Sequence, residues 1–573
     1  TPQVTNLALL ADLDNNSDGT VVLQNPVAVS GNLRLSGHDI DGGVDGIRLT
    51  AQRMLLRSGS SEDISVRSAS TSLPLLLDAA TSANLRITAA AGLQLRDLNA
   101  DGSAFASSGA TGQLNLTAAD TIHVVDKILT AGSVNLNATG QIVIDGAIDP
   151  ETITLTASDD IQINNALVAT HLITVTAGTD GTGSISSTSA GTLTASGPGN
   201  TGEIRLTSGD VAGAIQLHGR VESAADMTIT ATGGAINGTA ELLAQSLRMT
   251  AATGIGNLNP LNITTGNVEA NTANGDLLLQ NSLAAVYTSL STGTGLISVT
   301  TAGTAEFQNV QTSDGDIQIF SESAAIFVDN VKAGSTGNVL RINSETLAEL
   351  NSDSAADLTA DRIILLTNRG IGSVSNALEL SGSGLQLTAV SRSGSIVLTA
   401  DTTVEVATAL DQSGLQTGIP GQPAGGNGSA DPQVLSLTTT GSLLINADVS
   451  NFAGGDVLLQ AGAEIRQQSP TTITAIDSGA IQLQAIGDIR LSTLQSGASV
   501  EVRSQQGSII DNNDSPGNRR TNVSADSLLL QAVSIGQPPA AFFTDLPEAL
   551  EVSLTGALSV DVAGGTLTVR RRR

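Results

Sequence analysis

The feature that most constrains this chain is an apolar pattern that returns about every twenty residues. Residues 134–167, VNLNATGQIVIDGAIDPETITLTASDDIQINNAL, contain the pattern twice, while most residues between the apolar positions differ. Matching segments begin 20, 19 and 20 residues apart, at Leu114, Val134, Ile153 and Ile173. A period of this length, with two or three short strands in each unit, is typical of a solenoid.

Within each repeat, apolar and polar residues alternate, which indicates a strand with one buried face. We therefore predict an all-β fold, a right-handed parallel β-helix (β-solenoid) with coils of about 19–24 residues and roughly 28 coils. The left-handed alternative would show a hexapeptide period, which we do not find. Side chains that stack on the next coil must be aliphatic, so Ile153, Leu155, Ile161 and Ile163 should point inward. Thr154 should face solvent.

The composition fits a narrow core of stacked aliphatic side chains. Aromatic residues make up 1% of the chain and hydrophobic residues 40%, with 61 glycines available for turns. The absence of cysteine excludes disulfides and thiolate metal sites. The net charge of −29 disfavours nucleic acid and anionic lipid, and no apolar run reaches the roughly 18 residues of a membrane helix. We therefore expect no nucleic-acid partner and no membrane insertion of this segment.

A longer repeat is superimposed on the coils. Four segments share a polar residue, an aliphatic strand and a closing glycine or Gly-Ile-Gly: LTAQRMLLRSG (49–59), LAQSLRMTAATGIG (243–256), LTADRIILLTNRGIG (358–372) and VSADSLLLQAVSIG (523–536). Duplication of blocks of several coils explains this pattern. We expect the glycines to lie at tight corners, where a positive φ or the close approach of a neighbouring coil excludes a side chain.

Stretches rich in proline and glycine divide the chain. We predict a solenoid shaft with an irregular N-terminal start over residues 1–415, and a loop or joint over residues 416–433. The solenoid would continue over residues 434–535. A proline-rich loop and a terminal β coil would follow over residues 536–573.

The coils also resemble a known family. The Φ-x-Φ-x-Ala coils from Leu114 to Ala177, with ADRIILLTNRGIGS (360–373) and GSIIDNN…NVSADSLLLQA (507–532), are similar to filamentous-haemagglutinin-like proteins and related very large bacterial surface adhesins. The resemblance covers most of the chain at the level of the repeat pattern. It implies a right-handed β-helical shaft, secretion across the outer membrane, and a role in adhesion, aggregation or extracellular matrix at the bacterial cell surface. The family's N-terminal secretion motif, Asn-Pro-Asn-Gly-Ile, is not evident, so the similarity is to the shaft.

Parallel β-helices also include carbohydrate-active enzymes, which need paired carboxylates together with basic and aromatic residues that hold sugars. This chain has only 25 Lys and Arg, and its four His occur in unrelated contexts. The GHD segment at 37–39 is not accompanied by further catalytic motifs. We therefore predict that the chain is not an enzyme. The alternative is a carbohydrate-active β-helix enzyme or a polysaccharide-binding protein.

Two acidic segments are candidates for calcium, although the fold requires no cofactor. DLNADG presents oxygen ligands at alternate positions before a turn glycine, as calcium loops do: Asp97, Asn99 and Asp101. DLDNNSDG follows the same pattern more loosely, with Asp12, Asp14, Asn16 and Asp18. Neither segment has the acidic twelfth residue of an EF-hand loop, and Asp, Asn and Gly are also ordinary turn residues.

The partner expected of a shaft is more shaft. Neither end of the sequence contains a convincing cap, because Leu7 and Leu9 begin one end and the other stops in a strand at Val569. Open strand edges and uncovered core positions lead to stacking. We therefore expect either continuation of the same polypeptide or head-to-tail assembly into a filament. Other surface proteins or glycans are further candidate partners.

Overall fold

The structure is a computed structural model. It describes residues 5–11, 20–23, 29, 31–37, 39–41, 47–49, 51–58, 63–68, 70, 73–81, 84–107, 112–130, 132–334, 336–410, 412, 414–421, 433–513, 520–536 and 549–571. Throughout these ranges the regular elements are β-strands, and the chain forms a parallel β-solenoid of about 23 turns. The expected all-β β-helix is confirmed. The turns are fewer than the roughly 28 expected from a uniform twenty-residue coil, because several coils are longer.

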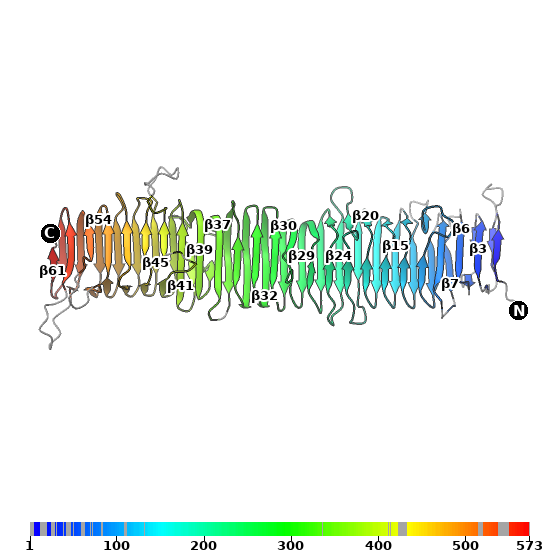
Figure 1. Cartoon of the computed structure of the whole chain (residues 1–573), viewed down its shortest axis with the longest axis horizontal. Coiled ribbons are helices and arrows are strands. Elements are labelled where there is room, and N and C mark those ends of the chain that lie inside the picture. Colours follow the sequence, from blue (N-terminus) through cyan, green and yellow to red (C-terminus); the bar gives the residue numbers. More distant parts are fainter. Residues whose placement is uncertain are drawn as a thin grey trace. The chain divides into compact units, whose positions relative to one another are not determined.

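The chain consists of two compact units, Thr1–Ser282 and Leu283–Arg573. In the first unit, coils stack in chain order, and most strands pair in parallel with their counterparts one coil later (Figure 1). The regular coils of this unit contain three strands, which form three rows. The first row is β9 (Leu85–Ala89), β12 (Leu114–Ala118), β15 (Ser133–Ala138), β18 (Thr152–Ala157), β21 (Leu172–Thr176), β24 (Glu203–Ser208) and β27 (Asp226–Ala231). The second row is β10 (Leu93–Leu95), β13 (Ile122–Val124), β16 (Ile142–Ile144), β19 (Ile161–Ile163), β22 (Ile185–Ser187), β25 (Ile215–Leu217) and β28 (Ile236–Gly238). The third row is β11 (Phe105–Ser107), β14 (Ile128–Leu129), β17 (Ile148–Asp149), β20 (Leu167–Ala169), β23 (Leu193–Ala195) and β26 (Val221–Ser223).

Less regular strands flank these three rows in the first unit. The preceding strands are β1 (Leu7–Leu10), β3 (Asn32–Gly37), β5 (Ile47–Leu49), β6 (Arg53–Ser58), β7 (Ile64–Ser68) and β8 (Leu75–Thr81). A separate two-stranded sheet contains β2 (Thr20–Val22) and β4 (Asp39–Asp41). The strands after the rows are β29 (Glu241–Ala251), β30 (Leu261–Thr272) and β31 (Leu277–Asn281). β29 is long because it pairs with both β26 and β27.

The strand register confirms the repeat found in the sequence. Leu114 pairs with Val134, Val134 with Ile153, and Ile153 with Ile173. Ile173 then pairs with Ile204, 31 residues later. Loops leave the solenoid within this coil and return without changing the register, so insertions lengthen a coil and leave its core intact.

The predicted inward positions are also confirmed. Ile153, Leu155, Ile161 and Ile163 are fully buried, whereas Thr154 is partly exposed. Each inward side chain lies against its counterparts in the coils before and after. This stacking explains why the apolar positions recur while the outward residues vary.

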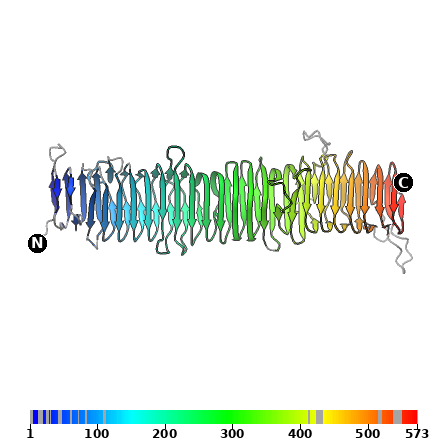
Figure 2. The same ribbon diagram turned by 180° about the vertical axis from the view of Figure 1, so that it is seen from behind.

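Figure 2 shows the stacked strands of the second unit from behind, coloured from green to red. The strand pairings show that this unit begins with two-stranded coils and ends with three-stranded coils. The two-stranded part contains β32 (Ala285–Thr294), β33 (Ile297–Thr301), β34 (Ala305–Asp314) and β35 (Ile317–Phe320). A transition follows, with β36 (Ala325–Ala333), β37 (Val339–Glu349), β38 (Leu358–Thr359), β39 (Arg362–Ile371), β40 (Leu378–Ser381) and β41 (Leu385–Ser391).

The three rows of the second unit continue from this transition. The first row is β42 (Ile396–Ala400), β45 (Leu435–Thr439), β48 (Val457–Ala461), β51 (Ile481–Ala485), β54 (Ser499–Ser504), β57 (Ser527–Ala532) and β60 (Leu558–Val562). The second row is β43 (Val404–Val406), β46 (Leu443–Ile445), β49 (Ile465–Gln467), β52 (Ile489–Leu491), β55 (Ser508–Asp511) and β58 (Ser534–Ile535). The third row is β44 (Leu415–Thr417), β47 (Val449–Asn451), β50 (Thr472–Ala475), β53 (Thr493–Ser496), β56 (Val523–Ala525), β59 (Leu550–Leu554) and β61 (Val569–Arg571).

One corner of the transition has an unusual connection. Val328 of β36 pairs with Glu349 of β37, and Val331 of the same strand pairs with Leu358 of β38. On β36, only two residues lie between Val328 and Val331. In the next coil, their partners Glu349 and Leu358 are separated by the whole segment 350–357. This segment leaves the solenoid as a loop at the corner.

The closing glycines of the longer repeat lie where the sequence predicts tight corners. Gly256, Gly372 and Gly536 have φ values of +67°, +60° and +83°, a backbone conformation that favours glycine. Gly59, in the first copy of the repeat, lies outside the described residues. The corner prediction is therefore confirmed for three of the four copies.

The segment boundaries expected at 415/416, 433/434 and 535/536 stay predictions. The proline- and glycine-rich stretch 416–433 lies within the second unit, and its described residues are 416–421 and 433. The coil resumes in register after it, because Ile396 pairs with Leu435, 39 residues later.

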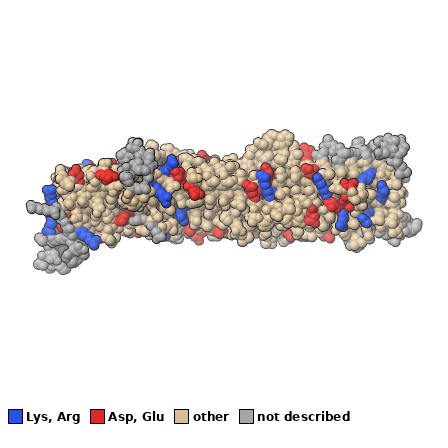
Figure 3. Space-filling model, turned by 45° about the horizontal axis from the view of Figure 1, so that its top comes forward, with Lys and Arg blue, Asp and Glu red and all other residues tan. Residues whose placement is uncertain are grey.

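Charged side chains are dispersed on the face shown in Figure 3, in small groups separated by uncharged surface. Strand geometry explains several ion pairs, because residues two apart lie on the same face of a strand. Arg205 Nε lies 2.6 Å from Glu203 Oε1 in this way. Other pairs join successive coils, such as Arg248 Nη2 and Glu269 Oε1 at 3.2 Å. Within the described ranges, no helix has the length and hydropathy of a membrane span.

Candidate functional site

The calcium candidate at residues 97–101 forms a tight loop between β10 and β11. Asp97 Oδ1 accepts hydrogen bonds from the backbone N–H groups of Ala100 at 2.6 Å and of Asn99 and Asp101 at 3.2 Å each. Asp97 Oδ2 accepts from Gly102 N–H at 2.7 Å. These bonds, above all that from Gly102, lower the pKa of Asp97. The Asp97 carboxylate therefore accepts hydrogen bonds from the backbone N–H groups of its own loop.

A basic side chain lies beside the same loop. Arg57 Nη2 is 3.1 Å from Asp101 Oδ2 and 2.7 Å from the buried Asp78 Oδ1. Asp101 Oδ2 also accepts from Asn99 Nδ2 at 2.9 Å, the largest cause of the lowered pKa of Asp101. Calcium binding by this loop stays a prediction. A calcium ion here would have to displace the Arg57 guanidinium and the backbone N–H groups that already donate to these carboxylates.

The second calcium candidate, Asp12, Asp14, Asn16 and Asp18, lies outside the described residues.

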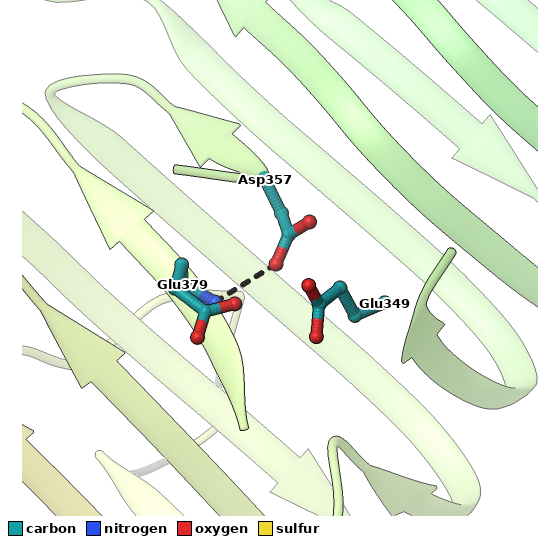
Figure 4. A group of neighbouring side chains, drawn as sticks. All are labelled: Glu349, Asp357 and Glu379. Carbon is teal, nitrogen blue, oxygen red and sulfur yellow. Dashed lines mark hydrogen bonds between the residues drawn. The ribbon is translucent and has the colours of Figure 1, made fainter. Parts of the chain in front are cut away.

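The structure brings together a different acidic group, which we call the acidic cluster: Glu349, Asp357 and Glu379. One carboxylate oxygen from each residue lies within 4.8 Å of those of the other two. Figure 4 shows the three carboxyl groups converging from different segments of the transition in the second unit. No other described group of three His, Cys, Asp or Glu has this geometry.

Each member of the acidic cluster is placed by the strand rows. Glu349 is the last residue of β37, Asp357 directly precedes β38, and Glu379 is the second residue of β40. Leu358 pairs with Leu380, so Asp357 and Glu379 lie side by side in successive coils. The backbone N–H of Glu379 donates a hydrogen bond of 2.9 Å to Asp357 Oδ2.

The 350–357 loop holds the cluster from one side. The backbone N–H of Asp353 donates to Glu349 Oε1 at 2.9 Å, and the N–H of Ala355 donates to Asp353 Oδ1 at 2.6 Å. Ser352 Oγ donates to Asn376 Oδ1 at 2.9 Å, which joins this loop to the corresponding loop of the next coil. The cluster therefore lies where two stacked corner loops meet the solenoid.

Burial determines the electrostatics of the acidic cluster. Glu349 is 5% exposed and Asp357 is 2% exposed. Removal from water raises the pKa of Asp357 to about 9, and the neighbouring Glu349 and Glu379 carboxylates act in the same direction. Burial also raises the pKa of Glu379, with Glu349 and Asp353 as further causes. Such a group can share a proton or bind a cation.

The sequence analysis missed the acidic cluster, although one signal for it was present. Glu379 follows Asp357 by 22 residues, about one coil, so the two had to stack if both lay on the same row. The position of Glu349 could not be inferred in this way, because it depends on the path of the 350–357 loop.

A second group of buried polar side chains surrounds Asn522 and forms hydrogen bonds with backbone and side-chain atoms. Asn522 Nδ2 donates to Asp511 Oδ1 at 2.6 Å and to Ser492 O at 3.2 Å, and its Oδ1 accepts from the N–H of Glu551 at 2.9 Å. The bond to Asp511 lies within one coil, and the bonds with Ser492 and Glu551 join that coil to the coils before and after it, so these buried polar groups are satisfied by the structure itself.

Comparison with known proteins assigns no role to these sites. The chain matches no protein-family model, no curated protein and no solved structure.

Proposed function

We propose that this chain is the non-catalytic shaft of a secreted bacterial cell-surface fibre or adhesin, with a role in adhesion, aggregation or extracellular matrix. One observation carries the proposal: within each unit, parallel coils stack in register on an aliphatic core. Such an architecture builds length by repetition and needs no pocket. The resemblance of the coils to filamentous-haemagglutinin-like proteins supports the same function.

The arrangement of titratable residues also favours a structural role. His123, His171 and His218 lie in separate coils, and the nearest described carboxylate of His123 is that of Asp145, at 2.6 Å. Glu349 and Asp357 are too deeply buried to contact a polysaccharide unless the coil opens. Glycoside hydrolysis requires two carboxyl groups that both reach the sugar.

Immunogold electron microscopy of the producing bacterium would test the proposal. Antibodies raised against the purified chain should label fibres at the cell surface, and deletion of the gene should reduce attachment or self-aggregation. Label confined to the cell interior would contradict a surface function.

The alternative, a carbohydrate-active enzyme or polysaccharide-binding protein, predicts a different result. The purified chain would be incubated with a panel of acidic and neutral polysaccharides, and new reducing ends would be measured. Depolymerisation that a single Asp→Asn or Glu→Gln change abolishes would overturn the structural proposal. Binding without depolymerisation would favour the polysaccharide-binding alternative.

We further propose that the chain's partner is more of the same solenoid, from the same polypeptide or from a second copy. Within each unit, every coil presents strand edges and a layer of aliphatic side chains to the next coil, and such a surface suits further coils of the same kind. Electron microscopy of native material should show continuous fibres, and discrete single-chain particles would refute both versions. Mass measurement after denaturation separates one long polypeptide from a polymer of short chains.

A further inference from the structure

We propose that the acidic cluster, Glu349, Asp357 and Glu379, binds one divalent cation, and that Ca²⁺ is the ion that fits it. The site lies outside both segments that the sequence suggested for calcium. The inference is independent of the proposed surface function, because it rests on the geometry of one corner of the second unit.

The three carboxylates can share one ion. One oxygen from each lies within 4.8 Å of those of the other two, so a single cation can contact all three residues. Ca²⁺ takes about 6–8 oxygen ligands, carboxylates among them, in a flexible geometry. Mg²⁺ demands near-ideal octahedral geometry and usually keeps several waters, with only one or two carboxylates as ligands. Three converging carboxylates, two of them deeply buried, therefore favour Ca²⁺ over Mg²⁺.

Unsatisfied oxygens point to a missing positive partner. Glu349 is 5% exposed and its Oε1 accepts from Asp353 N–H, but its buried Oε2 accepts no hydrogen bond. Glu379 Oε2 is likewise buried without a donor. A buried carboxylate oxygen without a partner is costly, whereas a metal ion satisfies it directly.

Basic side chains do not fill this role. Within the part of the chain that the structure describes, no Lys, Arg or His forms an ion pair with the three carboxylates. The nearest such pair in sequence, Arg369 with Glu345, does not include a cluster residue. A proton on Asp357 would neutralise one carboxyl group of the three and serve the hydrogen bond between the Asp357 and Glu379 side chains. It would still leave the buried Oε2 of Glu349 without a donor and the Glu349 and Glu379 carboxylates close together.

A bound ion would join three segments that are otherwise linked at this corner by a few backbone hydrogen bonds. Glu349 ends β37, Asp357 ends the 350–357 loop, and Glu379 belongs to the next coil. Calcium would therefore tie the loop to two successive coils at the corner where the two-stranded solenoid becomes three-stranded. We expect the ion to order this corner.

The test is calcium titration of the full chain after removal of metal with EDTA. Isothermal titration calorimetry should show saturable binding of CaCl₂ that is tighter than that of MgCl₂, and the thermal midpoint should rise with calcium. In the unmodified protein, calcium should slow hydrogen exchange in peptides covering 349–358 and 376–381. This exchange measurement locates the site without any substitution.

Substitutions then assign the ligands. Glu379→Gln keeps the shape of a partly exposed side chain, and it should abolish the calcium-dependent protection at 349–358. Glu306→Gln, at an outward position of β34, is the matched control and should leave the protection unchanged. Asp97→Asn separates this site from the 97–101 loop and should also leave it unchanged.

Three results would overturn the proposal. The first is a chain that binds no calcium, and the second is calcium-dependent protection that lies away from residues 349–358. The third is retention of that protection by folded Glu379→Gln. If calcium has no effect and Glu379→Gln raises the thermal midpoint, the cluster is held by a shared proton instead of a cation.

Discussion

At the scale of the residue, the face of the strand on which a side chain lies determines how much folding free energy its substitution costs. Leu155 is fully buried between its counterparts in the neighbouring coils, whereas Thr154 is partly exposed. Leu155→Ala should lower the opening free energy of β18 by about 2–5 kcal/mol, the usual cost of a large-to-small change in a packed core. Hydrogen exchange of the β18 amides measures this quantity. Thr154→Ala is the control, and an equal loss in both variants would show that the strand register is wrong.

Asp145 provides a test of an exposed interaction between coils. Its Oδ1 accepts from Asn164 Nδ2 at 2.8 Å, and its Oδ2 lies 2.6 Å from His123 Nε2. These contacts lower the pKa of Asp145 below 3.8, so the folded state favours the ionised form. The stabilisation is therefore present above about pH 4 and is lost as the pH falls through the lowered pKa.

Asp145→Asn should thus lower the thermal midpoint slightly at pH 7. The loss should correspond to less than about 1 kcal/mol, because water screens a side chain that is 43% exposed. The difference from the unmodified protein should disappear in strong acid. Asp149→Asn, at an exposed position of β17, is the control. A difference that persists below the lowered pKa would contradict the assignment to charge.

At the scale of the element, corners impose the strictest local requirement. Gly256 has a φ of +67°, and a Cβ there would lie 2.5 Å from Leu278 O. Gly256→Ala should cost about 1–2 kcal/mol from backbone conformation alone, and the close contact adds to this loss. Gly266→Ala is a matched control, because a Cβ there meets only Gln245 O at 3.9 Å. Thermal unfolding of both variants tests the prediction, and equal midpoints would contradict it.

Loops at the corners explain how the solenoid accepts insertions. The coil from Ile173 to Ile204 and the coil from Ile396 to Leu435 are long, yet both resume in register. Insertions that leave from a corner do not disturb the side chains that stack inside. The 350–357 loop belongs to the same class, but it contains Asp357 of the acidic cluster and Asp353, whose backbone N–H donates a hydrogen bond to Glu349.

At the scale of the whole molecule, stability should be distributed along the chain. Each coil of a solenoid contacts only its neighbours, so the effect of a substitution decays with distance along the stack. Leu155→Ala should therefore increase hydrogen exchange in β15 and β21, which pair with β18. Exchange in β48, β51 and β54 of the second unit should stay unchanged. Uniform acceleration of exchange in both units would show that the chain unfolds as one cooperative body.

The sequence by itself determined the architecture of this protein. Inward side chains stack on their own counterparts one coil later, so the same aliphatic pattern must recur at the length of a coil. Ile153, Leu155, Ile161 and Ile163 could be assigned to the core for this reason, and Gly256, Gly372 and Gly536 to corners. The requirement is local and repeated, and a linear sequence records it directly.

Only the tertiary structure decided where the chain departs from its repeat. The number of turns, the lengths of the long coils and the acidic cluster all depend on loops whose paths no periodicity describes. Asp97 and Asp101 are calcium candidates from the sequence, and only the fold shows that Arg57 and backbone donors lie beside them. Glu349, Asp357 and Glu379 come from two coils and meet because a corner loop brings them together. Contacts of this kind depend on distances in space, which a repeat in sequence does not encode.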